Sequence, residues 1–527
     1  MNQSSVHLLD LPNEMLFNIL KKLDNVDVLY SLAGINNERL DSITREETFS
    51  RILNFSLVIR NTKIIDAVLD RFCNYILPRI HYNVKCLVVE PTSMECILLA
   101  TDYPNFTELK IFNFQRDSSL RYFKEDSSLR YIFKKQITKL DLINKDCEVA
   151  VGSWNTYTKI VYAHILTYCE NLEHLKIIAT PTTEYPGLSV RYLPASAFSS
   201  STLTYLCISV VTITDCLYLL DGRLKQLNTF IVRIYCAGKN SSIVHNMDDL
   251  PNLKCFSLIQ YGLIEEYDNI IIALLRRMLY LEKLTLYLRI ACKNVFIDPI
   301  RLINEFSTYS PRLHSFKFYL STEHNINDLV CYLSNNDIKQ NYMNIGYQEV
   351  SNIVCFAFDR ATYHIFTLPF EFMWLLSIGT IFPNIVFNNV IELSVHDVVP
   401  FEHEFFLRIA KAFPLLRKFF VSDLSSLSYN AKKSSDNILS YQIVEYPYLT
   451  LLDIGRTNTT CVEQFLNETK THLPCLAELR VGYDDLRIIT EDFTREVTRR
   501  NCINVTRLIT RRQIVGSKDF YIYFPLL

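Results

Sequence analysis

A six-residue pattern of apolar and polar positions recurs along most of the chain. Apolar residues occupy its first, fourth and sixth positions, and successive copies start about 30 residues apart. Clear copies begin at Phe106, Leu172, Leu203, Leu227, Leu253, Leu281, Leu313, Val390, Leu416, Leu449 and Leu476, and weaker copies begin at Ile52, Val84, Ile137 and Ile353. Many copies follow a turn phrase such as Tyr103-Pro104-Asn105 or Leu250-Pro251-Asn252. We therefore interpret the chain as an array of related structural units.

Each unit is predicted to contain a helix, a turn and a short strand. The fourth and sixth positions alternate as residues on one face of a strand do, and the first position enters from the turn. Between copies, apolar residues such as Phe405, Phe406 and Ile409 share one helix face. Burying three apolar side chains contributes roughly 5–9 kcal/mol, whereas ordering about 30 residues costs several times as much. Because a lone unit cannot fold, the units must stack.

This arrangement resembles the leucine-rich-repeat family over roughly residues 50–515. The resemblance implies an α/β fold, a curved solenoid with a parallel strand face and outer helices. The chain departs from the family three residues after the third apolar position, where the family usually has Asn. That position here holds Tyr261, Arg289, Ser321, Thr457 and Asp484. We therefore expect the asparagine ladder between neighbouring loops to be missing.

Residues 8–48 do not follow the repeat and predict three short helices. Pro12 suits the first turn of the first helix, which carries an apolar stripe of Met15, Leu16, Ile19, Leu20 and Leu23. Asp27 is expected to cap the second helix, and the third is expected from about Asn36 to Glu47. So small a module buries too little surface to be stable by itself. It must pack on the first repeats or on another protein.

The module resembles the F-box. The matching residues are Leu11-Pro12-x-Glu14, Ile19-Leu20, Leu23, Asp27-Val28, Leu32 and Ile35, whereas Asn36 and Arg39 depart from the family pattern. The resemblance implies binding to a Skp-type adaptor and, through it, to a cullin–RING ubiquitin ligase. The adaptor-binding residues that it implies are Leu11, Pro12, Glu14, Leu16, Ile19, Leu20, Leu23 and Val28. The alternative is that the apolar stripe only packs on the first repeat.

Composition and charge narrow the classes of partner. The 54 Lys and Arg residues oppose 56 Asp and Glu residues, a formal charge of −2, which argues against nucleic-acid and membrane partners. Neither a GxGxxG nor a GxxxxGK string occurs, so we expect no nucleotide and no other cofactor. The 15 cysteines include no CxxC pair, which favours reduced thiols. The first residues do not form a secretory signal, and we expect a cytoplasmic or nuclear protein.

Three further segments invite interpretation. The apolar window from Ile365 to Phe387 is broken by Pro369 and Pro383, so it is too short to span a membrane and predicts a buried helix. Residues 396–404 gather two His and three acidic residues without metal-ligand spacing, which predicts turn and helix-cap roles. Residues 494–527 carry seven basic and two acidic residues. We interpret them as a polar cap on the array, the alternative being a docking patch for an acidic client segment.

These observations predict three domains: a helical module at 1–50, the repeats at 51–515 and a cap at 516–527. No catalytic or metal-binding residue stands out, so we expect a receptor that is not itself an enzyme and that holds an unknown client protein near the ubiquitin-transfer machinery. Client contacts are predicted at outward strand positions: Lys110, Glu173, Lys176, Lys283, Lys317 and Arg480. The alternative function is a protein-interaction scaffold that takes no part in ubiquitination.

Overall fold

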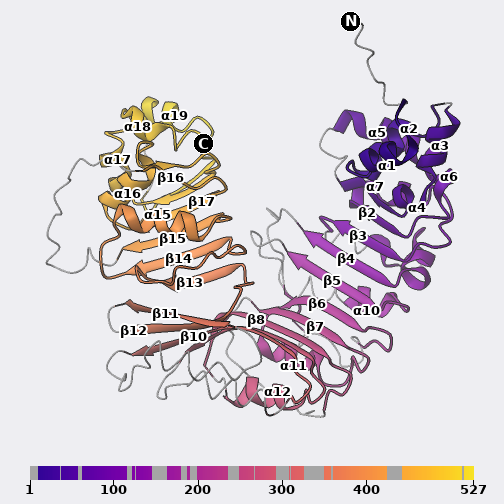
Figure 1. The fold of residues 1–527 in the computed structure, drawn as a ribbon, viewed down its shortest axis with the longest axis horizontal. Helices are drawn as coiled ribbons and strands as arrows, with labels where there is room; N and C mark the ends of the chain where they lie inside the picture. Colours follow the sequence, from indigo (N-terminus) through magenta and orange to yellow (C-terminus); the bar gives the residue numbers. More distant parts are fainter. Residues whose placement is uncertain are drawn as a thin grey trace, which may run out of the picture. The chain divides into compact units, whose positions relative to one another are not determined.

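The chain divides into two compact units (Figure 1). A computed structural model describes residues 10–35, 37–56, 62–114, 121–124, 126–144, 163–179, 187–189, 199–234, 249–265, 268–291, 308, 310–325, 349–357, 360–423, 442–512 and 516–527. Unit 1 comprises Met1–Gly262, Ile271–Leu284 and Tyr309–Leu313, and unit 2 comprises Leu263–Ile270, Thr285–Thr308 and His314–Leu527. Within the described ranges, no helix is long and apolar enough to cross a membrane.

Four short helices form the N-terminal part of unit 1. They are α1 (Asn13–Leu20), α2 (Asn25–Leu32), α3 (Glu38–Thr44) and α4 (Glu47–Ser50). Their shared core consists of Leu16, Leu20, Val28, Leu40, Ile43 and Phe49. The prediction that Asp27 caps the second helix is wrong. The side chain of Asp24 accepts the bond from the backbone N–H of Val26, and Asp27 lies in the first turn, where a carboxylate favours the helix dipole.

Eight parallel strands follow in chain order and form the sheet of unit 1. They are β1 (Ile52–Asn54), β2 (Cys86–Val89), β3 (Glu108–Phe112), β4 (Lys139–Asn144), β5 (His174–Ala179), β6 (Tyr205–Val210), β7 (Thr229–Ile234) and β8 (Cys255–Ile264). Parallel neighbours need a crossover of about a dozen residues or more. The residues between successive strands provide that length.

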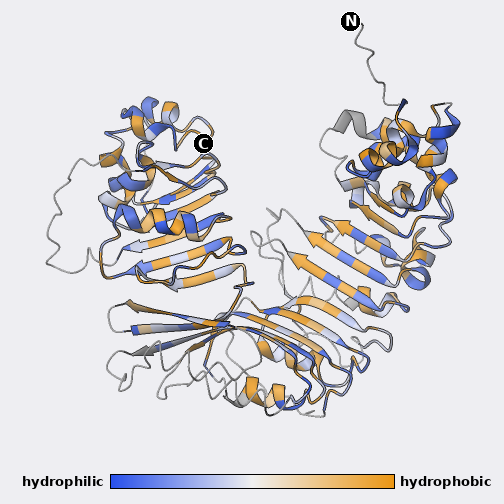
Figure 2. Ribbon diagram, in the orientation of Figure 1, coloured by the Kyte–Doolittle hydropathy of each residue, from blue (hydrophilic) through white to orange (hydrophobic). Residues whose placement is uncertain are grey.

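The fourth positions of the sequence pattern form one continuous row across this sheet. Strand register pairs, in order, Leu109, Leu140, Leu175, Leu206, Phe230 and Phe256. None of these side chains is more than 2% exposed. Figure 2 shows the resulting alternation of hydrophobic and hydrophilic bands along the strands. The predicted parallel strand face is therefore confirmed for unit 1.

Helical segments lie between these strands and after the last of them. They are α5 (Thr62–Arg71), η3 (Phe72–Ile76), α6 (Leu77–Ile80), α7 (Pro91–Leu98), η4 (Ile132–Gln136), α10 (Ala163–Tyr168), α11 (Ile213–Leu219), η8 (Asp268–Ile272) and α12 (Ala273–Arg276). One of them, α11, begins with a reciprocal capping box between Thr212 and Asp215. The order of helix, turn and strand matches the predicted unit. This mixed α/β architecture is consistent with a leucine-rich-repeat-like fold.

Asparagine side chains link neighbouring turns at a position that the sequence argument did not consider. Asn105, Asn171 and Asn252 each directly precede the first apolar residue of a copy. Their side-chain amides donate to backbone carbonyls of the preceding turn, at distances of 2.7, 2.7 and 2.8 Å. These bonds are distinct from the ladder that was predicted to be missing, whose asparagines would follow the strand. The amide lies before the strand rather than after it, and it satisfies a turn carbonyl there.

Unit 2 begins with an arrangement that is partly antiparallel. Its strands follow the order β9 (Lys283–Ala291), β10 (Ser315–Asn325), β12 (Arg360–Leu368) and β11 (Glu349–Ala357), and β9 lies mostly in this unit. Both β10 and β11 run antiparallel to β12. The copy that begins at Ile353 is therefore not a parallel repeat, contrary to the prediction. Only two residues separate β11 from β12, too few for a crossover.

The apolar window from Ile365 to Phe387 is not helical and is only partly buried, since Ile381 is 80% exposed and Val386 is 55% exposed. The buried helix predicted there is therefore wrong. It comprises the end of β12 and the strand β13 (Trp374–Ile378), separated by the cis peptide bond between Leu368 and Pro369. Proline lacks the backbone N–H that a helix interior needs. Periodicity alone cannot tell a short apolar strand from a buried helical segment.

A second parallel sheet completes unit 2. Its strands are β13, β14 (Glu392–Asp397), β15 (Lys418–Asp423), β17 (Leu451–Arg456), β19 (Glu478–Val481) and β20 (Arg507–Ile509). Register again aligns fourth positions, namely Leu393, Phe419, Leu452 and Leu479, all fully buried. A separate parallel pair is formed by β16 (Val444–Glu445) and β18 (Thr471–His472). The repeat pattern is thus confirmed for strands that precede the antiparallel strands in the sequence and for strands that follow them.

Helices accompany this second sheet. They are α15 (His403–Ala412), α16 (Thr459–Leu466), α17 (Tyr483–Ile489), α18 (Glu496–Arg499) and α19 (Lys518–Tyr523). The predicted helix face of Phe405, Phe406 and Ile409 is buried, as expected. Near the C-terminus, Phe493 packs against the ring of Phe520 at a centroid distance of 5.1 Å. This contact joins α19 to the residues that precede it.

Candidate interaction sites

Three apolar side chains on and after α1 are exposed, and we name Met15, Ile19 and Leu23 the apolar ridge. Their exposed fractions are 53%, 42% and 53%. Met15 and Ile19 are four residues apart and lie on one face of α1. The backbone N–H of Leu23 donates to the carbonyl of Leu20 in the turn that follows. Exposed apolar side chains grouped in this way are typical of a surface that a partner covers.

Three of the eight residues predicted to bind the adaptor lie in the core of the helical module. Leu16, Leu20 and Val28 are each at most 4% exposed and pack against one another. The predicted stripe therefore comprises two faces, because one residue turns a helix by about 100°. Leu16 and Leu20 face inward, and their neighbours Met15 and Ile19 face outward. The remaining predicted residues are exposed or half-buried: Leu11, Pro12, Glu14, Ile19 and Leu23.

Arg39 has a structural role that the sequence argument missed. Its guanidinium donates to the side-chain oxygen of Asn13 and to the backbone carbonyl of Leu11. These bonds tie α3 to the start of α1. Arg39, although it departs from the F-box pattern, thus fixes Leu11 and the first turn of α1, the helix that carries Met15 and Ile19.

A row of charged side chains crosses the outward face of the sheet in unit 1. Register places Lys110 of β3, Asp141 of β4 and Lys176 of β5 side by side, and we name these three the charged row. The Lys110 ammonium lies 3.8 Å from one Asp141 oxygen, and His174 Nε2 lies 3.3 Å from the other. Two predicted client contacts, Lys110 and Lys176, therefore flank a shared carboxylate. A third, Glu173, is exposed directly before β5.

An aromatic pair adjoins the charged row. The rings of His174 and Tyr205 stack with their centroids 3.9 Å apart and their planes at 6°. Burial is the main cause that raises the pKa of Tyr205 to about 12, so the phenol is neutral. Sequence reasoning did not single out this pair, although both residues occupy outward positions of recognised strands. Their pairing depends on the register between β5 and β6.

The other three predicted client contacts do not join the charged row. Lys283 is exposed at the start of β9. Lys317 on β10 forms an ion pair with Glu371 at 2.6 Å, and Arg480 on β19 forms one with Glu478 at 2.6 Å. A client that contacted Lys317 or Arg480 would compete with these internal carboxylates.

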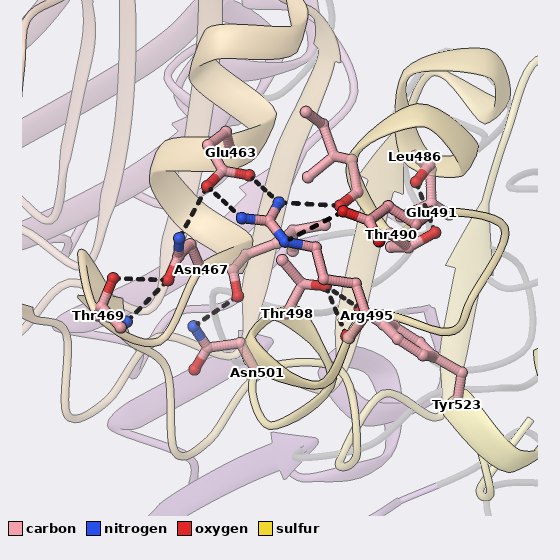
Figure 3. Close-up of polar contacts among 12 residues, drawn as sticks. Glu463, Asn467, Thr469, Leu486, Thr490, Glu491, Arg495, Thr498, Asn501 and Tyr523 are labelled. Carbon is pink, nitrogen blue, oxygen red and sulfur yellow. Dashed lines mark hydrogen bonds and ion pairs between the residues drawn. The ribbon is translucent and has the colours of Figure 1, made fainter. Parts of the chain in front are cut away.

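Charge pairs and hydrogen bonds organise the C-terminal part of unit 2 (Figure 3). The Arg495 guanidinium contacts both carboxylate oxygens of Glu463 on α16, at 2.5 and 3.0 Å, and donates to the carbonyl of Ile489 at 3.1 Å. Burial by itself would raise the pKa of Glu463, but hydrogen bonds from Arg495 and Asn467 lower it below its ordinary value. The carboxylate is therefore ionised, and its ion pair with Arg495 links α16 to the start of α18.

Most of the basic residues near the C-terminus pair with carboxylates in the same way. The further pairs are Arg499 with Glu496 at 3.6 Å, Arg500 with Glu468 at 3.3 Å, Arg507 with Glu478 at 3.2 Å and Arg512 with Asp484 at 2.7 Å. Counting Arg495, four of these five arginines pair with acidic residues earlier in the chain, which offsets most of the excess positive charge in residues 494–527. This arrangement favours the polar cap over an acidic-client patch.

The residues around His396 hold loops together. The Asp397 carboxylate accepts bonds from the backbone of Thr380 at 2.7 Å and of Val398 at 2.8 Å, which confirms a turn role. Glu402 directly precedes α15, but its side chain makes no cap bond. His403 lies 3.1 Å from the Gln464 side chain. Within the described part of the chain, no three His, Cys, Asp or Glu side chains are grouped so that they could hold a metal ion.

Comparisons with known proteins add little to the fold assignment, which rests on the strand register and on the burial of the apolar positions. No family model and no curated protein matches the sequence. Among solved structures, the chain is similar to the leucine-rich repeat-containing protein LegL7 from Legionella pneumophila, with a TM-score of 0.28 and 14% sequence identity. The match covers 56% of this chain and 81% of that chain. So weak a likeness supports neither fold nor function by itself.

Proposed function

We propose that this protein is the substrate-recognition subunit of an SCF-type ubiquitin ligase. The apolar ridge and the residues beside it bind a Skp-type adaptor, and the outward strand faces bind a client protein. The chain contributes no catalytic residue, because holding a client lysine near the charged conjugating enzyme is enough to accelerate transfer. The observation that carries the proposal is the exposure of the apolar ridge beside a well-packed helical core.

The energetics of the apolar ridge favour a bound partner. Fully burying a Met, Ile or Leu side chain contributes about 1.5–3 kcal/mol, and each ridge side chain is already about half buried. Covering the remainder therefore contributes about 1 kcal/mol for each residue. A few residues typically carry most of the binding energy of a protein interface. The resemblance of residues 8–35 to the F-box supports a Skp-type adaptor as that partner.

The charged row supports a polar client contact. Asp141 is 14% exposed and lies 3.8 Å from the Lys110 ammonium, so a single partly buried carboxylate accompanies the two lysines of the charged row. The surrounding lysines thus retain capacity for an acidic group from a client. Because these charges are partly exposed, client binding should weaken as salt screens them.

Co-purification with a Skp-type adaptor tests the proposal. The tagged full-length chain is expected to retain the adaptor, and the double variant Ile19→Asp, Leu23→Asp should lower retention at least tenfold. Both substitutions place a charge in an apolar contact without entering the module's core. The matched control is Ile488→Asp, whose side chain is 64% exposed on α17 and which should retain the adaptor normally.

Thermal melting monitored by circular dichroism shows whether the variants fold. Failure of the wild-type chain to retain any Skp-type adaptor would overturn the ligase role. The protein-interaction scaffold would then be the better description.

A further inference from the structure

Two cysteines that are far apart in the sequence meet in unit 1. The sulfur atoms of Cys73 and Cys96 lie 3.0 Å apart. A disulfide bond is about 2.05 Å long, so closing it requires a shift of about 1 Å. Cys73 lies in η3 and Cys96 in α7, and these two helical segments pack against each other.

The two thiols differ in their exposure to solvent. Cys96 is exposed, whereas Cys73 is 8% exposed. Burial, followed by the hydrogen bond and charge of Cys96, raises the pKa of Cys73 to about 12 and keeps its thiol protonated. Cys73 also lies in a π-helical turn, a rare geometry that occurs often at functional sites.

We propose that Cys73 and Cys96 form a reversible disulfide when the protein meets a peroxide. The Cys96 thiolate attacks one peroxide oxygen, which gives a sulfenic acid on Cys96 and releases hydroxide. The Cys73 sulfur then attacks the Cys96 sulfur. An S–S bond forms, and the hydroxyl of Cys96 leaves with the Cys73 proton as water. Overall, two thiols lose two electrons and two protons, and one hydrogen peroxide is reduced to two waters.

The position of Cys73 connects this modification to the N-terminal helices. The neighbouring Phe72 ring stacks on Tyr30 of α2 with a centroid distance of 6.2 Å. Arg71 donates to the carbonyl of Ala33, at the end of α2, at 2.9 Å. A disulfide to α7 would therefore brace the segment on which α2 rests. The modification does not depend on the proposed adaptor or client.

Peptide mapping of the full-length chain tests the inference. The reduced protein is treated with one equivalent of hydrogen peroxide, alkylated and digested without reductant by trypsin and a glutamyl endopeptidase. Cleavage at Glu95 separates Cys96 from Cys86, which shares its tryptic peptide. We expect a linked pair of peptides containing Cys73 and Cys96, two hydrogens lighter than their sum, and its loss after dithiothreitol. Cys475, an exposed cysteine in unit 2, provides the internal control and should remain unlinked.

Single variants distinguish the role of Cys96, which reacts with peroxide, from that of Cys73, which then attacks the Cys96 sulfur. With Cys73→Ser, peroxide should convert Cys96 to a sulfenic acid that dimedone traps. With Cys96→Ser, Cys73 should stay a free thiol, and Cys73→Ala replaces the first variant if the buried hydroxyl prevents folding. Over-oxidised Cys96 without the linked peptides in the wild-type protein, or a link from Cys96 to a second chain, would overturn the inference.

Discussion

At the scale of single residues, buried polar groups find partners from distant parts of the chain. His364 on β12 is fully buried, with its Nε2 2.8 Å from the Ser377 carbonyl and its Nδ1 2.8 Å from the Tyr319 hydroxyl. A carbonyl only accepts, so Nε2 carries the proton and Nδ1 accepts from Tyr319. The ring is thus neutral. Burial chiefly, with the nearby charges of Arg289 and His396, lowers the pKa of His364 to about 3.

This histidine predicts that unit 2 loses stability as the pH falls below about 6.5. The unfolded chain protonates His364 near its ordinary pKa of 6.5, and the folded chain does so only near 3. The unfolded state therefore binds more protons in that window and gains free energy relative to the folded state. Burial also lowers the pKa of His396, which adds a slope of the same sign.

Urea unfolding at several pH values between 7 and 4 measures the effect. His364→Gln cannot titrate but can still donate to Ser377 and accept from Tyr319. This variant should lose about 1–3 kcal/mol at pH 7 and show a shallower dependence of unfolding free energy on pH than the wild-type protein. Equal slopes for the two proteins would contradict the prediction.

At the scale of elements, the turns between repeats are closed by asparagine amides. In unit 1, Asn105, Asn171 and Asn252 each donate to a carbonyl of the preceding turn. In unit 2, Asn504 donates to the Pro474 carbonyl at 3.0 Å. The amide of Asn501 has a more demanding place, because it is buried and donates to the carbonyls of Phe465 and Thr471, among others. Hydrogen bonds from asparagine amides to backbone carbonyls thus stabilise turns at both exposed and buried positions.

The same substitution at these two positions should have unequal effects. Asn501→Asp replaces the donating amide by a carboxylate that faces backbone carbonyls in a buried site, and we expect a loss of about 2–4 kcal/mol. Asn504→Asp loses one exposed hydrogen bond and should cost about 1 kcal/mol or less. Chemical denaturation of both variants measures the difference. Equal losses would show that burial does not decide the strength of these links.

At the scale of the whole molecule, stability in each unit depends on contacts between neighbouring repeats. Leu175 is fully buried on β5 and lies in register between Leu140 and Leu206. Each strand therefore depends on the next one for the burial of its apolar side chains. The protein behaves as a stack whose members cannot be stable alone.

A cavity at the centre of the row should therefore weaken several repeats together. Leu175→Ala is expected to lower the free energy of unfolding by about 2–5 kcal/mol and to reduce hydrogen-exchange protection in β4 and β6 as well as β5. Lys176→Ala, the next residue but on the opposite face, should change stability by less than about 0.5 kcal/mol. Loss of protection confined to β5 would contradict this cooperativity.

Much of the fold could be predicted from the chain because each repeat encodes its own periodicity. Leu109, Leu140 and Leu175 are fourth positions in the sequence, and they pair in register in the sheet. The strand at Ile353 and the window from Ile365 to Phe387 were predicted incorrectly, since short apolar runs suit several local structures. The proposed adaptor-binding surface was predicted less well. Leu16 and Ile19 are both apolar, but Leu16 faces the module's core and Ile19 faces solvent, and the sequence does not distinguish them.

The sequence by itself determined which residues repeat, which faces are apolar and that the units must stack, since these follow from local spacing and from the cost of ordering a lone unit. Only the tertiary structure decided which apolar side chains of α1 remain exposed and which carboxylates neutralise the C-terminal arginines. It also decided that the thiols of Cys73 and Cys96 meet. These outcomes depend on the register and packing of segments tens of residues apart, which no local pattern specifies.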